Sequence, residues 1–93
     1  MDDTTMLAAL KVDLGITTTA YDARLAQYIT AAQSAIEIEG VELDSSSIAD
    51  GNLVVMYAAW LWRKRDTGEG IPRMLRWQLN NRLFSQKVGE ENG

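Results

Sequence analysis

The chain has 93 residues and a formal net charge of −4, and it contains neither cysteine nor histidine. This length predicts one domain, the lack of cysteine excludes disulfides, and without either residue type we expect no zinc site and no other cofactor. The acidic amino terminus predicts no signal peptide, and the longest apolar run, residues 53–62, is shorter than the roughly 20 residues of a membrane span, so we expect no membrane partner.

Apolar residues repeat with helical spacing along the chain, which predicts an all-α fold, a small bundle of about four helices. We expect a short first helix over residues 5–14, a second over 20–39, a third over 48–65 and a fourth over 72–88. The segment 41–47 is expected to be a loop with at most a short extended piece.

Glycines follow these segments at positions 15, 40, 68 and 89, where a left-handed residue commonly ends a helix. Residues 1–88 are therefore expected to form a single helical domain. Residues 89–93, which contain Glu90 and Glu91, are expected to form a flexible acidic tail.

The third helix is apolar on all sides from Leu53 to Trp62, a pattern typical of a helix that is buried all round. Trp60 falls on the same side as Met56 and Tyr57, so we expect it in the core. A chain this short has few elements to cover such a helix, and a partner chain could complete the burial.

The fourth helix carries two apolar stripes on nearly opposite sides. One stripe consists of Leu75, Leu79 and Leu83, and the other of Met74, Trp77, Phe84 and Val88. One stripe can pack on the chain's own core, and the second needs another surface, because exposed aromatic patches mark association sites. The alternative is a helix that lies between two others of its own domain.

Charge is divided along the chain. Residues 1–62 carry nine acidic and two basic residues, a net charge of −7, and residues 63–88 carry seven basic and two acidic residues, a net charge of +5. A dipolar surface can steer like molecules head to tail or set one sign against a polyanion. This division, with the second apolar stripe, favours self-association.

Catalytic motifs are missing, so we expect no enzyme: the Gly68–Gly70 turn lacks the Lys-Ser/Thr of a phosphate-binding loop. Nucleic-acid binding is the competing hypothesis, since the basic residues could contact phosphates while Trp62 or Trp77 stacks on bases. A helix-turn-helix regulator would read DNA with Arg73, Arg76, Asn80 and Lys87. The acidic first half argues against that alternative.

The first half, LAALKVDLGITTTAYDARLAQYITAAQSAIEIEG, resembles the opening of the phage head–tail connector proteins, which are the adaptor or head-completion proteins of long-tailed phages and prophages. In the second half an apolar helix containing Tyr57 ends in the basic run 63–65, followed by a glycine-containing loop and MLRWQLNNRLFSQKV. The resemblance spans nearly the whole chain and rests on patterns of helix and charge.

The resemblance implies a structural virion protein that forms a ring below the portal, extends the DNA channel and joins capsid to tail. It implies a homo-oligomeric ring, dodecameric in the virion, with the portal protein and the next connector or tail component as partners. We expect contact with passing DNA during packaging to be weak and non-specific, because tight phosphate binding would obstruct transit. The expected location is the head–tail junction of the virion, and the host cytoplasm during assembly.

The family has no catalytic residues to transfer, so the site residues are predicted from this chain. We predict subunit contacts at Trp62, Met74, Trp77 and Phe84. We predict a basic face toward a neighbouring subunit or DNA, consisting of Arg63, Lys64, Arg65, Arg73, Arg76 and Lys87.

Overall fold

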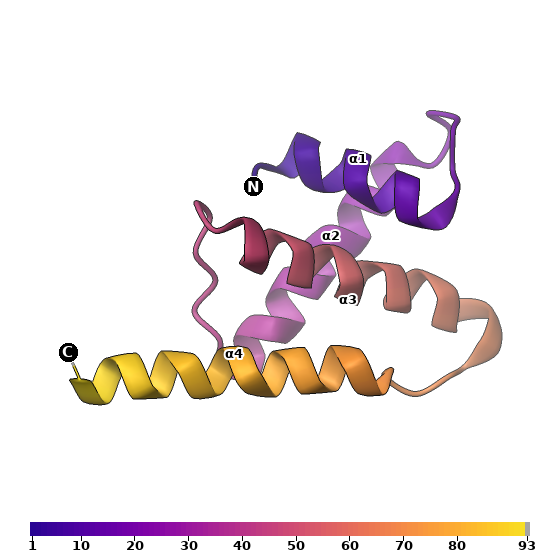
Figure 1. Cartoon of the computed structure of the whole chain (residues 1–93). Coiled ribbons are helices and arrows are strands. Elements are labelled where there is room, and N and C mark those ends of the chain that lie inside the picture. The colour runs from indigo at the N-terminus through magenta and orange to yellow at the C-terminus, as the bar shows by residue number, and fades with distance from the viewer. Residues whose placement is uncertain (93) are drawn as a thin grey trace.

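The structure is a computed structural model that describes residues 1–92, and it shows an all-α bundle of four helices (Figure 1). The helices are α1 (Asp3–Leu14), α2 (Asp22–Ile38), α3 (Ile48–Thr67) and α4 (Arg73–Asn92). The all-α prediction is confirmed, and each predicted helix is present. Within the described range no strand forms, so the 41–47 loop contains a turn but no paired extended piece.

Local capping sets several of the helix ends. The Asp2 carboxylate accepts from the Thr5 amide at 2.7 Å at the start of α1, and Ser47 accepts from the Asp50 amide at 3.1 Å at the start of α3. Gly15 and Gly68 end α1 and α3 in the left-handed conformation, at φ 70° and 65°. Sequence patterns predict these ends well because each depends on a few neighbouring residues.

The end of α4 differs from the prediction. The helix continues through Gly89 to Asn92, so most of the segment predicted as a tail is helical in the structure. A glycine inside a helix costs only about 1 kcal/mol, and Glu90 and Glu91 are good helix formers. Gly93 lies outside the described residues.

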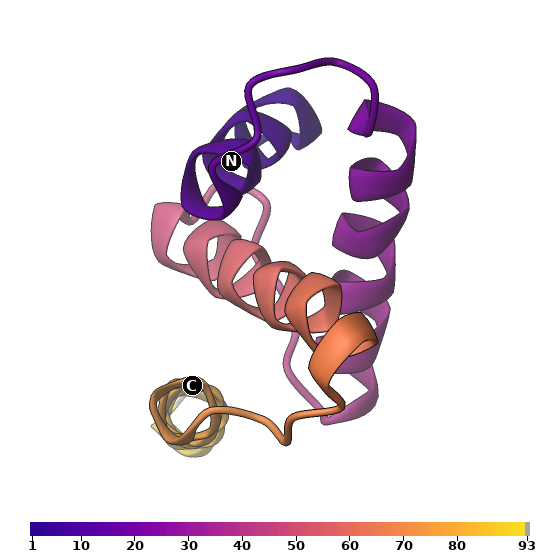
Figure 2. The same ribbon diagram turned by 90° about the vertical axis from the view of Figure 1, so that its right-hand side faces the viewer.

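Helix α3 lies between α1 and α4, and α2 crosses behind it (Figures 1 and 2). The α3 side chains from Leu53 to Ala59 are buried except Met56, which confirms that this helix is buried nearly all round. The cover comes from α1, α2 and α4 of the same chain. Burial of α3 therefore requires no partner chain.

The leucine stripe of α4 faces inward. Leu75 and Leu79 are both 2% exposed, and Leu83 is partly buried near Gly40. Burying a leucine stabilises a fold by about 1.5–3 kcal/mol, so this stripe attaches α4 to α3. The alternative, in which α4 lies between two helices of its own domain, is not realised (Figure 2).

Two polar side chains of α4, Arg82 and Gln86, complete the attachment. Arg82 donates to the Asp50 carboxylate at 2.7 and 3.0 Å and to the Glu42 carbonyl at 2.8 Å. Gln86 donates to the Gly40 carbonyl at 2.9 Å and accepts from the Glu42 amide at 2.7 Å. These bonds satisfy backbone groups of the loop between α2 and α3 and hold α4 across it.

Asp50 is 4% exposed and sits at the centre of this arrangement. Burial opposes its ionisation, but hydrogen bonds from Arg82 and the Asp44 amide, with the charge of Arg82, outweigh burial and lower the pKa of Asp50 below its usual value. The charged form is therefore the one that the fold stabilises.

Replacing Asp50 by asparagine should lower the free energy of unfolding at pH 7 by about 2–3 kcal/mol, because Arg82 is left without its charged partner. Since the folded pKa lies below the unfolded one, this stabilisation is present above about pH 4 and is lost as the pH falls through the folded pKa. Urea unfolding of wild type and Asp50→Asn at pH 7 and at pH 3 measures the difference in the free energy of unfolding at each pH.

The exposed Glu42→Gln variant is the matched control and should stay within about 0.5 kcal/mol of wild type at pH 7. A deficit in Asp50→Asn that is equally large at both pH values would contradict the assignment.

Candidate interaction surface on the last helix

The second apolar stripe of α4 points away from the rest of the molecule. Met74 is 59% exposed, Trp77 63%, Phe84 67% and Val88 37%. We call these four residues the outer stripe. Four large exposed apolar side chains along one side of a helix mark an interaction site in a chain whose core is complete without them.

Polar and basic residues border the outer stripe on one side. Arg73, Asn80 and Lys87 are exposed there, each about two helical turns from the next. A shallow hollow of about 670 Å³ lies over the amino-terminal part of α4, lined by Ile71, Arg73, Met74, Arg76, Trp77 and Asn80. An apolar centre with a cationic rim is the composition expected of a protein-binding surface.

Trp62 does not belong to this surface. Its ring packs edge-on against Tyr21, which precedes α2, and against Tyr28 of α2, with ring centres 5.8 and 5.5 Å away. The Arg65 guanidinium lies 3.6 Å from the centre of the Trp62 ring. Of the four predicted contact residues, the structure brings three together on α4 and places Trp62 in an aromatic cluster of its own chain.

Trp60 is partly buried against the core. Its ring meets Tyr57 edge-on at 5.3 Å, and its Nε1 donates to the Glu69 carbonyl at 3.3 Å. The side facing Lys64 is covered by that ammonium, 4.6 Å from the ring centre. The hydrogen bond from Trp60 to Glu69 thus holds the loop after α3 against the core.

The predicted basic face divides into two groups. Arg63 donates to the Asp13 carbonyl at 3.4 Å, while Lys64 and Arg65 lie over Trp60 and Trp62, so the cations at the end of α3 contact their own chain. Arg76 turns toward α2 and pairs with Glu39 at 2.5 and 3.2 Å. The hydrogen bond that Arg76 donates to Glu39 raises the pKa of Arg76.

Arg73 and Lys87 are the two remaining residues of the predicted basic face. Neither forms a hydrogen bond or ion pair with any residue from 1 to 89. They are the two cations of the predicted face that form no such contact within residues 1–89, and both border the outer stripe.

Sequence reasoning missed the contacts of Arg82, Gln86 and Asp50. A signal existed, because Arg82 and Gln86 fall at helical spacing from Leu75 and Leu79, on the same side of α4. A polar residue within a predicted buried face needs a polar partner, but only the fold identifies Asp50 and the loop backbone as that partner.

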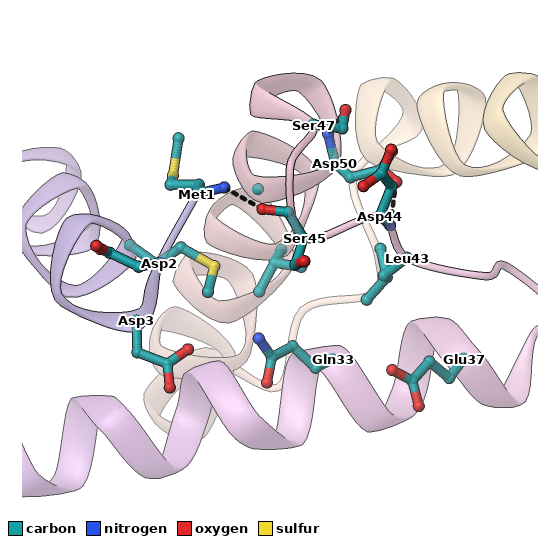
Figure 3. Close-up of a pocket in the computed structure, with 13 residues that line it drawn as sticks. Met1, Asp2, Asp3, Gln33, Glu37, Leu43, Asp44, Ser45, Ser47 and Asp50 are labelled. Carbon is teal, nitrogen blue, oxygen red and sulfur yellow. Dashed lines mark hydrogen bonds between the residues drawn. The ribbon is translucent and has the colours of Figure 1, made fainter.

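A second hollow, of about 420 Å³, lies between the start of α1, α2, the 41–47 loop and the start of α3 (Figure 3). Asp2 and Asp3 reach it from the start of α1, and Glu37 from α2. The amino-terminal amine donates to the Ser45 carbonyl at 2.6 Å and so joins α1 to the 41–47 loop. Among the side chains of residues 1–89, no three acidic groups stand close enough together to hold a metal ion.

Comparison with known proteins identifies no relative: no family model, no curated protein and no solved structure matches this chain. None of the four helices, over the part of the chain that the structure describes, has the length and apolarity to cross a membrane.

The different positions of the tryptophans predict different effects on stability. Trp62→Ala should lower the free energy of unfolding by about 2–3 kcal/mol, because it removes a partly buried ring from its tyrosine contacts. Trp77→Ala should change it by less than about 0.5 kcal/mol, because that ring contacts mainly solvent. Urea unfolding followed by circular dichroism, at a concentration where the chain is monomeric, compares them. Equal losses in the two variants would refute the placement of Trp77.

Proposed function

We propose that the chain is a structural subunit of the head–tail junction of a long-tailed phage or prophage, a connector or adaptor that forms a ring below the portal. In this role it extends the DNA channel and joins the capsid to the tail, and it performs no catalysis. The observation that carries the proposal is the outer stripe of α4, which is exposed although the core is complete without it.

Two further features support an assembly role. First, α1, α2 and α3 form a body that presents α4 along one edge (Figures 1 and 2), and all four residues of the outer stripe are exposed. Second, acidic residues that include Asp2, Asp3 and Glu37 line the hollow near the amino terminus, whereas Arg73 and Lys87 border the outer stripe. Unlike surfaces on one subunit allow heterologous contacts, which close into rings when the rotation permits.

The outer stripe would suit many kinds of assembly, and the resemblance of the sequence to phage connector proteins favours the connector ring among them. That resemblance spans nearly the whole chain. In the assembled junction we assign Met74, Trp77 and Phe84 to contacts with a neighbouring protein. Arg73 and Lys87 would face an acidic neighbour or the passing DNA, to which binding must be weak and independent of sequence so that transit is not obstructed.

Quantitative mass spectrometry of purified tailed particles from the strain that carries the gene tests the function directly. We expect the chain in the particles at a copy number equal to that of the portal protein, because both would follow the same symmetry. The portal is the internal reference, and particles that contain the portal without this chain would rule out the function.

Gel retardation on unrelated DNA sequences separates the connector from the helix-turn-helix regulator. We expect weak retention of equal strength on every sequence, lost between 50 and 200 mM salt, roughly the range over which phosphate contacts weaken. Arg73→Glu should reduce the retention of DNA. Arg24→Glu makes the same charge change at an exposed position of α2 and should reduce the retention less. A complex that prefers one sequence and survives physiological salt would favour the regulator.

A further inference from the structure

Residues on the outward side of α4 repeat with a regular alternation of three and four. Met74, Trp77, Asn81, Phe84 and Val88 follow one another at spacings of three, four, three and four. This is the heptad pattern, with Met74, Asn81 and Val88 at the a positions and Trp77 and Phe84 at the d positions. A repeat of 3.5 residues keeps one seam facing a partner helix, whereas packing on a globular core follows a wider stripe.

The structure leaves this seam uncovered. Asn81 is exposed like the four apolar residues of the outer stripe, so the five positions form one accessible line along α4. The helix has 20 residues, about 30 Å of length, and in both views no other element lies on its outer side (Figures 1 and 2). A second helix of the same length could therefore lie along it without meeting the body.

The one polar residue in the seam indicates which second helix would pack against it. A single asparagine at an a position, in an otherwise apolar seam, specifies register and favours two parallel strands, because two asparagine side chains can then hydrogen-bond across the pair. Asn81 of one chain would meet Asn81 of another. A partner with an apolar residue at that position would leave the Asn81 amide unpaired.

The flanks of the seam indicate the orientation. Arg73, Asn80 and Lys87 occupy one flank, and the neutral Gln78 and Ser85 occupy the other. In a parallel pair each flank meets the opposite flank of the partner, so the cations face neutral side chains. In an antiparallel pair Arg73 and Lys87 would face each other across the seam and repel.

We propose that α4 of a second copy of this chain covers the seam, in a parallel, in-register pair related by a two-fold axis. The pair goes beyond the proposed function and stands without it, since it rests on α4 alone. It keeps the outer stripe out of water in the free protein, and the stripe must be released before it can contact another component of a junction.

The seam is short, which sets the strength of the pair. It spans two heptads, and the next seam position is Glu91, so the apolar contact ends at Val88. Short coiled coils are marginally stable, so the pair should form and dissociate with concentration. Reversible pairing is what a subunit that later enters a larger assembly requires.

Cross-linking through an introduced cysteine tests the orientation, and the chain suits this test because it has no cysteine of its own. In the proposed pair Val88 of one chain lies beside Val88 of the other, so Val88→Cys should form a disulfide-linked dimer rapidly under mild oxidation. Ser34→Cys, an exposed position on α2 away from α4, is the control for random collision and should remain monomeric.

Other outcomes contradict the pair. Dimers that form only when Met74→Cys is mixed with Val88→Cys would show an antiparallel arrangement and overturn the proposal. Disulfide-linked dimers that form equally fast in Val88→Cys and Ser34→Cys would show random collision alone. That result would also overturn the proposed pair.

Light scattering coupled to size exclusion supplies an independent measurement on the unmodified chain. The mass should rise from one copy to two with concentration, and Trp77→Lys, with an unchanged circular dichroism spectrum, should stay at one copy over the same range. A wild-type mass of one copy at every concentration refutes the pair. A mass well above two copies, together with no disulfide-linked dimer of Val88→Cys, also refutes the pair. That result would agree with direct formation of a ring.

Discussion

Arg82 reaches from α4 to the carboxylate of Asp50 and the carbonyl of Glu42, and the position of the last helix depends on this contact. The three earlier helices pack on one another, but α4 meets them along a single line of leucines. Leucine packing alone permits a helix to slide or rotate, because dispersion contacts are weakly directional. The charged hydrogen bonds to Asp50 fix both the rotation and the register of α4.

This fixed rotation decides what the protein presents to its surroundings. With Leu75, Leu79 and Arg82 turned inward, Met74, Trp77 and Phe84 must face outward, because the two sets lie on opposite sides of one helix. A polar contact between α4 and a loop thus positions an apolar surface on the other side of the helix. The candidate site is therefore built on a rigid element, which favours a defined partner geometry.

The charge division of the sequence is reduced by folding. Arg76 and Arg82 pair with acidic residues contributed by the earlier part of the chain, at Glu39 and Asp50. Attraction between the two halves is thus used partly within the molecule, to attach α4. What remains for a partner is local: two cations beside the outer stripe and an acidic hollow near the amino terminus.

Sequence alone determined the number of helices, most of their ends, the burial of α3 and the presence of two apolar stripes on α4. These features depend on spacing and on caps such as Ser47 and Gly68, which act within a few residues. Only the tertiary structure decided which stripe faces outward and that Trp62 packs on Tyr21 and Tyr28. It also decided that Arg73 and Lys87 are the cations of the predicted face that form no hydrogen bond or ion pair within residues 1–89. Each of these depends on contacts between residues far apart in the chain, and local pattern carries no record of such pairings.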